Sequence, residues 1–187
     1  MIEAELKALV RDIDAASAAL NRRGAAQVCT YADRYFDYPD HRLTEQGREL
    51  RVRTITDNTG QTRVLLTYKE PPIDGDSGVK PEYETTAEDA DVLATVLGVL
   101  GVEELIAFHK HCVNYRFTAL GRDLLATLVT VPELKNQTFI EVETMADADD
   151  LNAALDVVRS VLHELGISEH DLTVETYTDA VTAQRRR

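Results

Sequence analysis

Hydrophobic and polar positions along the chain follow two periods, one typical of helices and one typical of strands. Apolar residues recur at helical spacing over residues 12–23, 85–100 and 147–165, and a glycine follows each segment. The sequence TTAE at 85–88 has capping-box spacing, which predicts the start of the second helix. Period-two alternation predicts eight strands, at residues 2–8, 34–38, 49–56, 62–69, 79–85, 108–118, 123–131 and 138–144. This mixture predicts an α+β domain.

One face of the predicted strands is unusually rich in charge. In the first strand Glu3, Glu5 and Lys7 alternate with apolar residues, so a charged row lies opposite an apolar row. A sheet with one solvated face would also alternate, but such faces usually contain more Thr, Ser and Gln. Acids and bases of matching parity recur in separate strands, namely Glu3, Glu5, Glu82, Glu84, Glu141 and Glu143 with Lys7, Arg51, Arg53, Lys69, Lys80 and Lys110.

A sheet that closes on itself would turn all of these rows inward. We therefore expect a closed, mainly antiparallel β-barrel tunnel with a charged lumen and with helices packed outside. Carboxylate oxygens suit Mg²⁺ or Mn²⁺, and Lys and Arg suit phosphate oxygens, so such a lumen fits a metal-bound polyphosphate. The tunnel domain is expected over residues 1–182, followed by a disordered basic tail at 183–187.

Composition narrows the range of partners. The 187 residues include 20 Lys and Arg against 33 Asp and Glu, which gives a net charge of −13. This balance argues against nucleic acid and against an anionic membrane surface as partners. The two cysteines, Cys29 and Cys112, cannot form a disulfide framework, and the N-terminus does not resemble a signal peptide. We expect a cytoplasmic protein that binds a small molecule.

A series of short motifs follows the same order as in a known family. These are EAELK at 3–7, DRYFD at 33–37, LRVR at 50–53, LTYK at 66–69, KPEYE at 80–84, FIEVE at 139–143 and ETY at 175–177. The order of these motifs, and the alternation of their charged residues, resemble those of the CYTH family, also called the triphosphate tunnel metalloenzymes. The resemblance covers most of the chain and agrees with the tunnel predicted from strand patterning.

The resemblance implies a divalent-metal-dependent enzyme that acts on a triphosphate. The reaction would be either that of a class IV adenylyl cyclase, which converts ATP to cyclic AMP and pyrophosphate, or hydrolysis of thiamine triphosphate or tripolyphosphate. It implies that Mg²⁺ or Mn²⁺ is held by Glu3, Glu5, Glu141 and Glu143. It also implies catalytic and substrate-binding roles for Lys7, Arg51, Arg53 and Lys69, and further substrate contacts from Lys80, Glu82, Glu84, Lys110 and Arg116. A homodimer is compatible with it.

The chain departs from the family pattern at two positions. Cys112 stands where a tunnel arginine is usual, and Val129 replaces an aspartate that commonly binds metal or acts as a base. Arg116 shares the parity of Cys112 and could substitute for the missing arginine. Loss of the aspartate leaves one metal site supported and weakens the case for a second. An altered substrate, a slow enzyme and a non-catalytic nucleotide- or polyphosphate-binding tunnel protein all remain open.

Four further side chains have simpler interpretations. His109 and His111 have the opposite parity to Lys110, so we expect them to face outward. Asp33 is expected to act as a hydrogen-bonding residue rather than as a metal ligand. Tyr177 matches a C-terminal tyrosine of cyclase-like members, and its role stays open.

Overall fold

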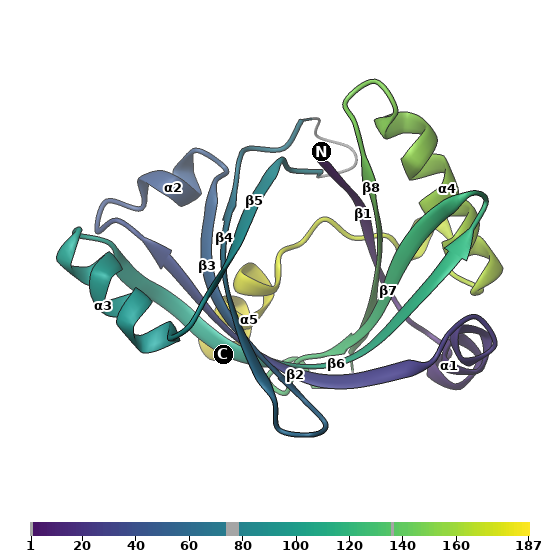
Figure 1. Ribbon diagram of the computed structural model, residues 1–187, viewed down its shortest axis with the longest axis horizontal. Helices are drawn as coiled ribbons and strands as arrows, with labels where there is room; N and C mark the ends of the chain where they lie inside the picture. Colours follow the sequence, from purple (N-terminus) through teal and green to yellow (C-terminus); the bar gives the residue numbers. More distant parts are fainter. Residues whose placement is uncertain (1, 74–78, 136) are drawn as a thin grey trace.

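An eight-stranded antiparallel sheet forms the body of the protein and curls strongly around a central hollow (Figure 1). The structure is a computed structural model that describes residues 2–73, 79–135 and 137–187. The strand order is β1-β8-β7-β6-β2-β3-β4-β5. The strands are β1 (Ile2–Leu9), β2 (Ala26–Asp37), β3 (Glu49–Asp57), β4 (Thr62–Lys69), β5 (Glu82–Ala87), β6 (Glu103–Ala119), β7 (Arg122–Thr130) and β8 (Thr138–Ala146).

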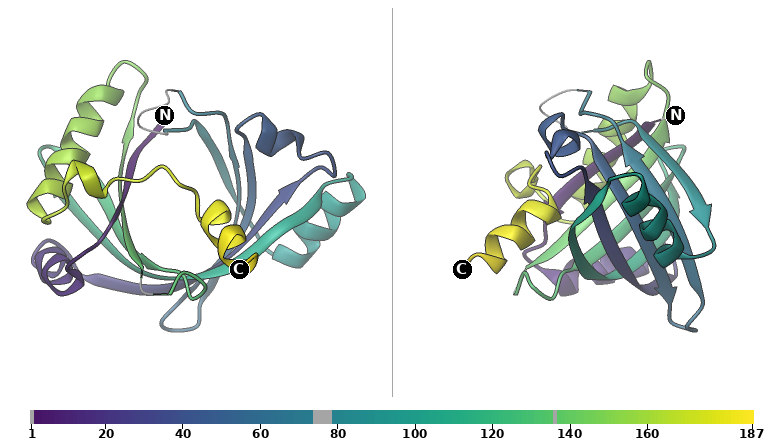
Figure 2. Two further views of the ribbon diagram at one scale, coloured as in Figure 1. Left: turned by 180° about the vertical axis from the view of Figure 1, so that it is seen from behind. Right: turned by 90° about the vertical axis from the view of Figure 1, so that its left-hand side faces the viewer.

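The helices lie outside the curled sheet and across one of its ends. They are α1 (Ile13–Asn21), α2 (Arg42–Glu45), α3 (Ala90–Val99), α4 (Leu151–Glu164), α5 (Tyr177–Arg185) and the 3₁₀ turn η1 (Glu169–Asp171). Helices α1, α3 and α4 cover the outer face, whereas the C-terminal segment crosses one end of the hollow and ends in α5 (Figure 2). No helix in the described part of the chain is both long and apolar enough to cross a membrane.

The prediction of an α+β fold with helices outside is confirmed, whereas the predicted closure of the sheet into a barrel is not shown. Within the described residues no ladder joins the edge strands β1 and β5, so the sheet is an open half-barrel. Pro81 directly precedes β5 and has no N–H to donate to a further strand. At this gap charged side chains approach each other instead, with Lys69 Nζ 4.0 Å from a carboxylate oxygen of Glu3.

Tertiary pairing overrides one predicted helix start. Residues 85–87, taken as the beginning of a capping box, belong to β5 and pair with residues 64–66 of β4. Asp89 caps α3 instead, because its carboxylate accepts hydrogen bonds from the N–H groups of Asp91 and Val92. Strands β2 and β6 begin at Ala26 and Glu103, before the predicted residues 34 and 108, and helices α2 and α5 were not predicted.

Helix α5 includes residues 183–185 of the segment that was expected to be a disordered tail. Its Arg185 donates hydrogen bonds to the Ala107 carbonyl at 2.7 Å and to Glu133 at 3.0 Å. These contacts attach the C-terminal helix to β6 and to the loop before β8. That the basic tail is disordered stays a prediction.

Three apolar clusters pack against the sheet, and those on its outer side hold the charged face inward. On the outer side α4 places Leu155, Val158 and Leu162 against β1 and β8, whose apolar row includes Leu6 and Val142. This packing confirms the predicted parity, because the same strands carry their acids on the opposite face. A second cluster fills one end of the hollow and contains residues of α5.

Shortening Leu162, which is 2% exposed, should lower the free energy of unfolding by about 2–5 kcal/mol, because Leu162→Ala leaves a cavity behind β1 and β8. Urea unfolding of the variant measures this loss. Val99→Ala on α3 is the control, since its side chain is 83% exposed and its loss should cost under about 0.5 kcal/mol. Equal effects in the two variants would contradict the assigned core.

Candidate functional site

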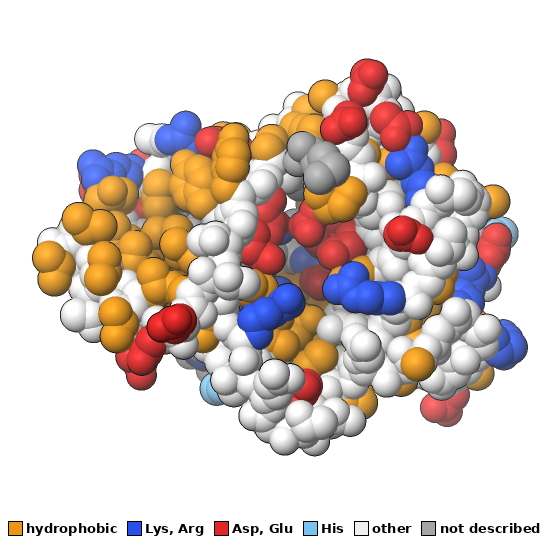
Figure 3. All heavy atoms as spheres, in the orientation of Figure 1, with side chains coloured by type: hydrophobic (Ala, Val, Ile, Leu, Met, Phe, Trp, Pro, Cys, Tyr) orange, Lys and Arg blue, Asp and Glu red, His pale blue; other side chains and the backbone are white. Residues whose placement is uncertain are grey.

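A single cavity of about 490 Å³ collects every residue that the sequence nominated for the site. Figure 3 looks into it and shows acidic and basic side chains on its walls. The residues come from β1 (Glu3, Glu5, Lys7), β3 (Arg51, Arg53), β4 (Lys69), β5 and the residues before it (Lys80, Glu82, Glu84), β6 (Lys110, Arg116) and β8 (Glu141, Glu143). The predicted strand parity is therefore confirmed, whereas the individual roles of these residues stay predictions.

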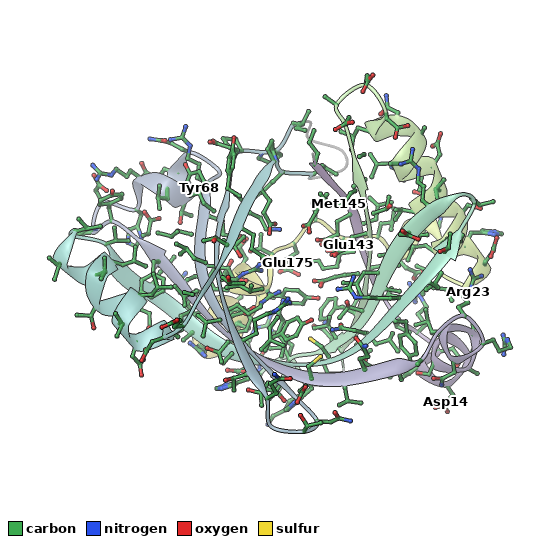
Figure 4. The ribbon with its side chains drawn as sticks, viewed as in Figure 1. Asp14, Arg23, Tyr68, Glu143, Met145 and Glu175 are labelled. Atoms are coloured by element: carbon green, nitrogen blue, oxygen red, sulfur yellow. The ribbon has the colours of Figure 1, made fainter. Side chains whose placement is uncertain are left out.

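Three carboxylates form a compact cluster on the β1–β8 wall of the cavity. Glu5 and Glu143 are cross-strand partners, and Glu3 lies on the same face two residues before Glu5. One oxygen from each of the three lies within 4.8 Å of the others. Figure 4 shows Glu143 projecting from β8 toward the hollow. Three carboxylate oxygens at this spacing are a donor set suited to a hard divalent cation such as Mg²⁺ or Mn²⁺.

The electrostatics of the cluster also fit a cation. Burial, together with the neighbouring Glu82 and Glu5, raises the pKa of Glu3 from 4.5 to about 7. Burial and nearby carboxylates likewise raise the pKa values of Glu5 and Glu143 above the ordinary value. Close like charges disfavour ionisation, and an intervening divalent cation would remove that penalty. The residues present therefore fit a divalent metal ion.

Glu141 lies in a different electrostatic environment from the three-carboxylate cluster. It is the cross-strand partner of Lys7, and its surroundings include Lys110 and the Tyr177 hydroxyl. Burial raises the pKa of Glu141, but Lys110, Tyr177 and Lys7 outweigh burial and lower it overall. This carboxylate is therefore ionised and balanced by lysines without a metal. Its predicted role as a ligand stays a prediction, and the geometry favours the other three acids.

A buried carboxylate fixes two of the cationic side chains. Asp33 forms a bidentate pair with Arg53 at 2.6 and 2.8 Å and lies 3.4 Å from Lys110 Nζ. The Asp33 side chain is fully buried. Burial raises the pKa of Asp33, but the positive charges of Arg53 and Lys110 outweigh burial and hold it well below its usual value. The expectation that Asp33 acts through hydrogen bonds is confirmed, and the residue holds both cations in place.

Two acids on β5 orient the cations of the neighbouring strands. Lys69 Nζ lies 2.6 Å from Glu82. Burial lowers the pKa of Lys69, but nearby carboxylates outweigh burial and raise it overall. Arg51 donates to the Thr67 hydroxyl at 3.3 Å, which in turn donates to Glu84 at 3.0 Å. The buried Nε of Arg51 has no hydrogen-bond partner within the described residues. An orphaned guanidinium N–H in this cavity is suited to an anionic ligand.

The C-terminal segment and the start of α5 line one end of the cavity (Figure 2). Both Lys7 Nζ and Lys110 Nζ lie against the Tyr177 ring, at 4.5 and 4.4 Å from its centroid. Lys7 also donates to the carbonyl of Glu175, in the segment that crosses this end. Tyr177 packs edge-on against Phe139, with ring centroids 5.3 Å apart. Thr176, Tyr177 and Thr178 therefore line this end of the cavity.

The two departures from the family pattern are cross-strand partners. Cys112 on β6 lies opposite Val129 on β7, and both are buried in the cluster that includes Tyr177. The arginine and the aspartate of the family pattern would therefore be neighbours, and this chain has an apolar pair in their place. Because both charges are absent together, neither is left buried without its partner. Burial raises the pKa of the Cys112 thiol to about 12, so it is a poor nucleophile.

Several lining residues escaped the sequence argument. Arg63, Ile55 and Met145 line the cavity and continue the inward rows of β4, β3 and β8. Their parity alone could have identified them, but the argument followed charged residues within family motifs. His109 and His111 are exposed on the outer face, as predicted.

We predict that the metal-free protein loses stability as pH rises through the shifted pKa of Glu3. Because this pKa is raised from 4.5 to about 7, the folded state binds more protons than the unfolded state within that window, and stability falls toward its upper end. Glu3→Gln removes the titration. Relative to this variant, the wild-type protein should lose about 3 kcal/mol between pH 4.5 and pH 8 in urea unfolding.

The control is Glu103→Gln, which changes an exposed acid on β6 and should follow the wild-type pH profile. Millimolar Mn²⁺ at pH 8 should restore the stability of the wild-type protein more than that of Glu3→Gln, because a bound cation stabilises the folded state. Parallel pH profiles for wild type and Glu3→Gln would refute the assigned repulsion.

Removing the Asp33 carboxylate should be strongly destabilising. Asp33→Asn leaves Arg53 and Lys110 buried without their counter-charge, with an expected loss of about 3–5 kcal/mol in the free energy of unfolding. Asp91→Asn is the matched control, since Asp91 pairs with Arg34 at 2.9 Å but its side chain is 93% exposed. That variant should lose under about 1 kcal/mol. A loss below 1 kcal/mol in Asp33→Asn would contradict the clamp.

Comparisons with known proteins agree with the fold. The chain is 26% identical over 182 residues to a Methanocaldococcus jannaschii protein named as an inferred adenylate cyclase, covering 96% of this chain and 98% of the relative. A solved Pyrococcus horikoshii protein superposes with a TM-score of 0.82 at 25% identity, covering 98% of this chain and 99% of that one. A Hippeastrum protein, described as having a dominant triphosphatase activity, superposes with a TM-score of 0.65 at 17% identity, covering 98% and 96%.

The family comparison extends over nearly the entire sequence. The model of the CYTH domain matches residues 1–177, from β1 to the first residue of α5. This range includes all three carboxylates of the cluster and all of the cations that face them. The chain therefore belongs to the CYTH domain family.

Proposed function

We propose that this protein is a divalent-metal-dependent enzyme that acts on a triphosphate-bearing substrate. The observation that carries the proposal is the juxtaposition, within one cavity, of a three-carboxylate cluster and a wall of buried cations. Neither half alone would be specific. Together they fit a substrate whose several phosphates are bound partly through a metal ion and partly through Lys and Arg.

The cations are held ready before a substrate arrives. Arg53 is fixed by Asp33 and Lys69 by Glu82, while the buried Nε of Arg51 has no partner among the residues that the structure describes. Preorganised donors of this kind stabilise the charge that develops in phosphoryl transfer without reorganising during the reaction. Positioning and electrostatics therefore supply most of the expected rate enhancement.

Glu3, Glu5 and Glu143 would hold the divalent cation. When bound, it would neutralise phosphate charge and lower the pKa of an attacking oxygen nucleophile. Arg51, Arg53 and Lys69 line the opposite wall and would bind the phosphate oxygens that face them. Tyr177 lies against Lys7 at one end of the cavity and would limit the room for phosphates there.

Two reactions are compatible with this pocket. Attack by water on a terminal phosphorus would make the protein a triphosphatase, whereas attack by the ribose 3′-hydroxyl on the α-phosphorus would make it an adenylyl cyclase. The naming of the Methanocaldococcus relative favours the second, and the activity described for the Hippeastrum protein favours the first. The direction in which the triphosphate lies in the pocket would decide between them.

A second candidate function is binding without turnover. The observation that favours it is the buried Cys112–Val129 pair at positions where the family pattern has an arginine and an aspartate. Such a protein would capture a nucleotide or polyphosphate in the same cavity. It would lack one metal ligand or general base that more active relatives use.

Phosphorus-31 NMR with Mg²⁺ or Mn²⁺ distinguishes the reactions, using ATP, thiamine triphosphate and tripolyphosphate in separate samples. Pyrophosphate with a cyclic nucleotide identifies the cyclase, and orthophosphate with a diphosphate product identifies the triphosphatase. Intact substrates with metal-dependent line broadening would instead support the binding protein. Intact substrates with unchanged signals would contradict both functions.

Glu5→Gln tests the metal assignment within the same assay. If the protein is an enzyme, we expect turnover to fall by at least about 100-fold, because the variant loses a charged ligand of the cluster. Glu88→Gln, which changes an acid outside the cavity between β5 and α3, is the control and should retain wild-type turnover. Normal turnover in Glu5→Gln would rule out the proposed metal site.

A further inference from the structure

We propose that Cys29 and Cys112 are a modification site, at which a peroxide converts two thiols into a reversible disulfide. They are the two cysteines of the sequence, and both are free thiols. A single buried cysteine usually serves as a small apolar residue. Two thiols that face each other across neighbouring strands can also react with each other. No step of the proposed reaction uses either thiol, so the inference goes beyond the proposed function.

Strand register brings the two thiols together. Cys29 on β2 is the direct cross-strand partner of Cys112 on β6, although residues 30–111 separate them along the chain. Directly opposed residues of an antiparallel pair point to the same face, with Cα atoms about 4.5 or 5.5 Å apart. Disulfides have Cα separations of about 4.4–6.8 Å, so both kinds of pair are within range. The two thiols also belong to one apolar cluster. The bond can therefore form without a change of register between β2 and β6.

The two thiols differ in access to a reagent and in acidity. Cys29 is 8% exposed and pairs with Asp57 at the end of β3, whereas Cys112 is 1% exposed. Burial raises the pKa of both thiols, that of Cys112 to about 12, but a hydrogen bond with Tyr31 partly offsets burial at Cys29. Asn114 donates to Cys29 Sγ at 3.2 Å, and a donor at sulfur stabilises a thiolate. Cys29 is therefore the thiol that meets the oxidant, and Cys112 is the thiol that completes the disulfide.

The oxidant is hydrogen peroxide, which is small enough for a site with so little exposure. The Cys29 sulfur attacks one peroxide oxygen, the O–O bond breaks, and Cys29 becomes a sulfenic acid as one water leaves. The Cys112 sulfur then attacks the Cys29 sulfur, the S–S bond forms, and the S–O bond breaks to release a second water. In total two thiols are oxidised to one disulfide, and one peroxide is reduced to two waters. Cross-strand proximity offsets the low thiolate fraction of Cys112, although both steps are slow.

The disulfide would form next to a side chain of the charged cavity. Besides the Cys29 sulfur, the Asn114 amide donates to the Tyr31 hydroxyl at 2.7 Å. The guanidinium of Arg53 lies 4.5 Å from the centroid of the Tyr31 ring. When the Cys29 sulfur turns toward Cys112, Asn114 loses one of these two acceptors. Oxidation therefore alters the packing directly behind a cation that lines the cavity.

Thiol counting and peptide mapping test the pair in the folded protein. After hours in millimolar hydrogen peroxide and removal of the peroxide with catalase, the protein is unfolded and alkylated. We expect the number of alkylated thiols to fall from two to none, and dithiothreitol to restore both. Peptide mapping should find Cys29 linked to Cys112 within one chain. Two thiols that persist, or sulfinic acid at either cysteine in place of the link, would overturn the proposal.

A shifted cysteine provides the matched control. Val28 precedes Cys29, pairs with Val113 and is 53% exposed, so it points to the opposite face of the sheet. The double variant Cys29→Ser with Val28→Cys keeps two thiols but places them on opposite faces. We expect no link within the chain. Such a link in this variant would show that the bond forms through unfolding, and it would overturn the role given to strand register.

Thermal unfolding gives a second readout. A bond that encloses residues 30–111 restricts the unfolded chain, so oxidised wild-type protein should melt about 5–10 °C above reduced protein. Peroxide treatment of Cys29→Ser should produce no gain, which separates the disulfide from oxidation of methionine. An equal or lower midpoint for the oxidised wild-type protein would contradict a folded sheet that accommodates the bond. None of these measurements involves a triphosphate, so their failure would leave the proposed function standing.

Discussion

The repulsion among Glu3, Glu5 and Glu143 is the constraint on which the rest of the structure depends. Three carboxylates whose oxygens lie within 4.8 Å of each other repel one another when ionised. The raised pKa values of Glu3 and Glu143 reflect this repulsion together with burial. The opposite wall offsets part of it, since Lys69 faces two of these acids across the gap between β1 and β5. Full relief requires a cation, so the chain maintains a local strain that a ligand would remove.

Packing outside the cavity makes this arrangement possible. Helix α4 covers the apolar row of β1 and β8, and Leu155, Val158 and Leu162 bury the backs of the strands that carry the acids. The cations of the other half are held by carboxylates of their own, such as Asp33, rather than by the cluster. Cations such as Arg53 and Lys69 therefore have fixed positions, and the apolar cluster around Tyr177 packs at one end of the cavity.

Strand parity was sufficient to predict which residues face the cavity, because alternation is a property of each strand alone. It placed Lys110 inward and His109 and His111 outward without knowledge of the partners of β6. Features that depend on other parts of the chain were not accessible in this way. The gap between β1 and β5, the extension of β5 over residues 85–87 and the docking of α5 all result from long-range contacts that no local pattern encodes.

The central claim is that one divalent cation and one triphosphate bind together between the carboxylate cluster and the cationic wall. Anomalous diffraction from crystals grown with Mn²⁺ and tripolyphosphate tests it most directly. The account predicts an anomalous peak in contact with oxygens of Glu3, Glu5 and Glu143, and phosphate density between that peak and Arg51. A peak elsewhere, or triphosphate bound outside the cavity, would contradict it.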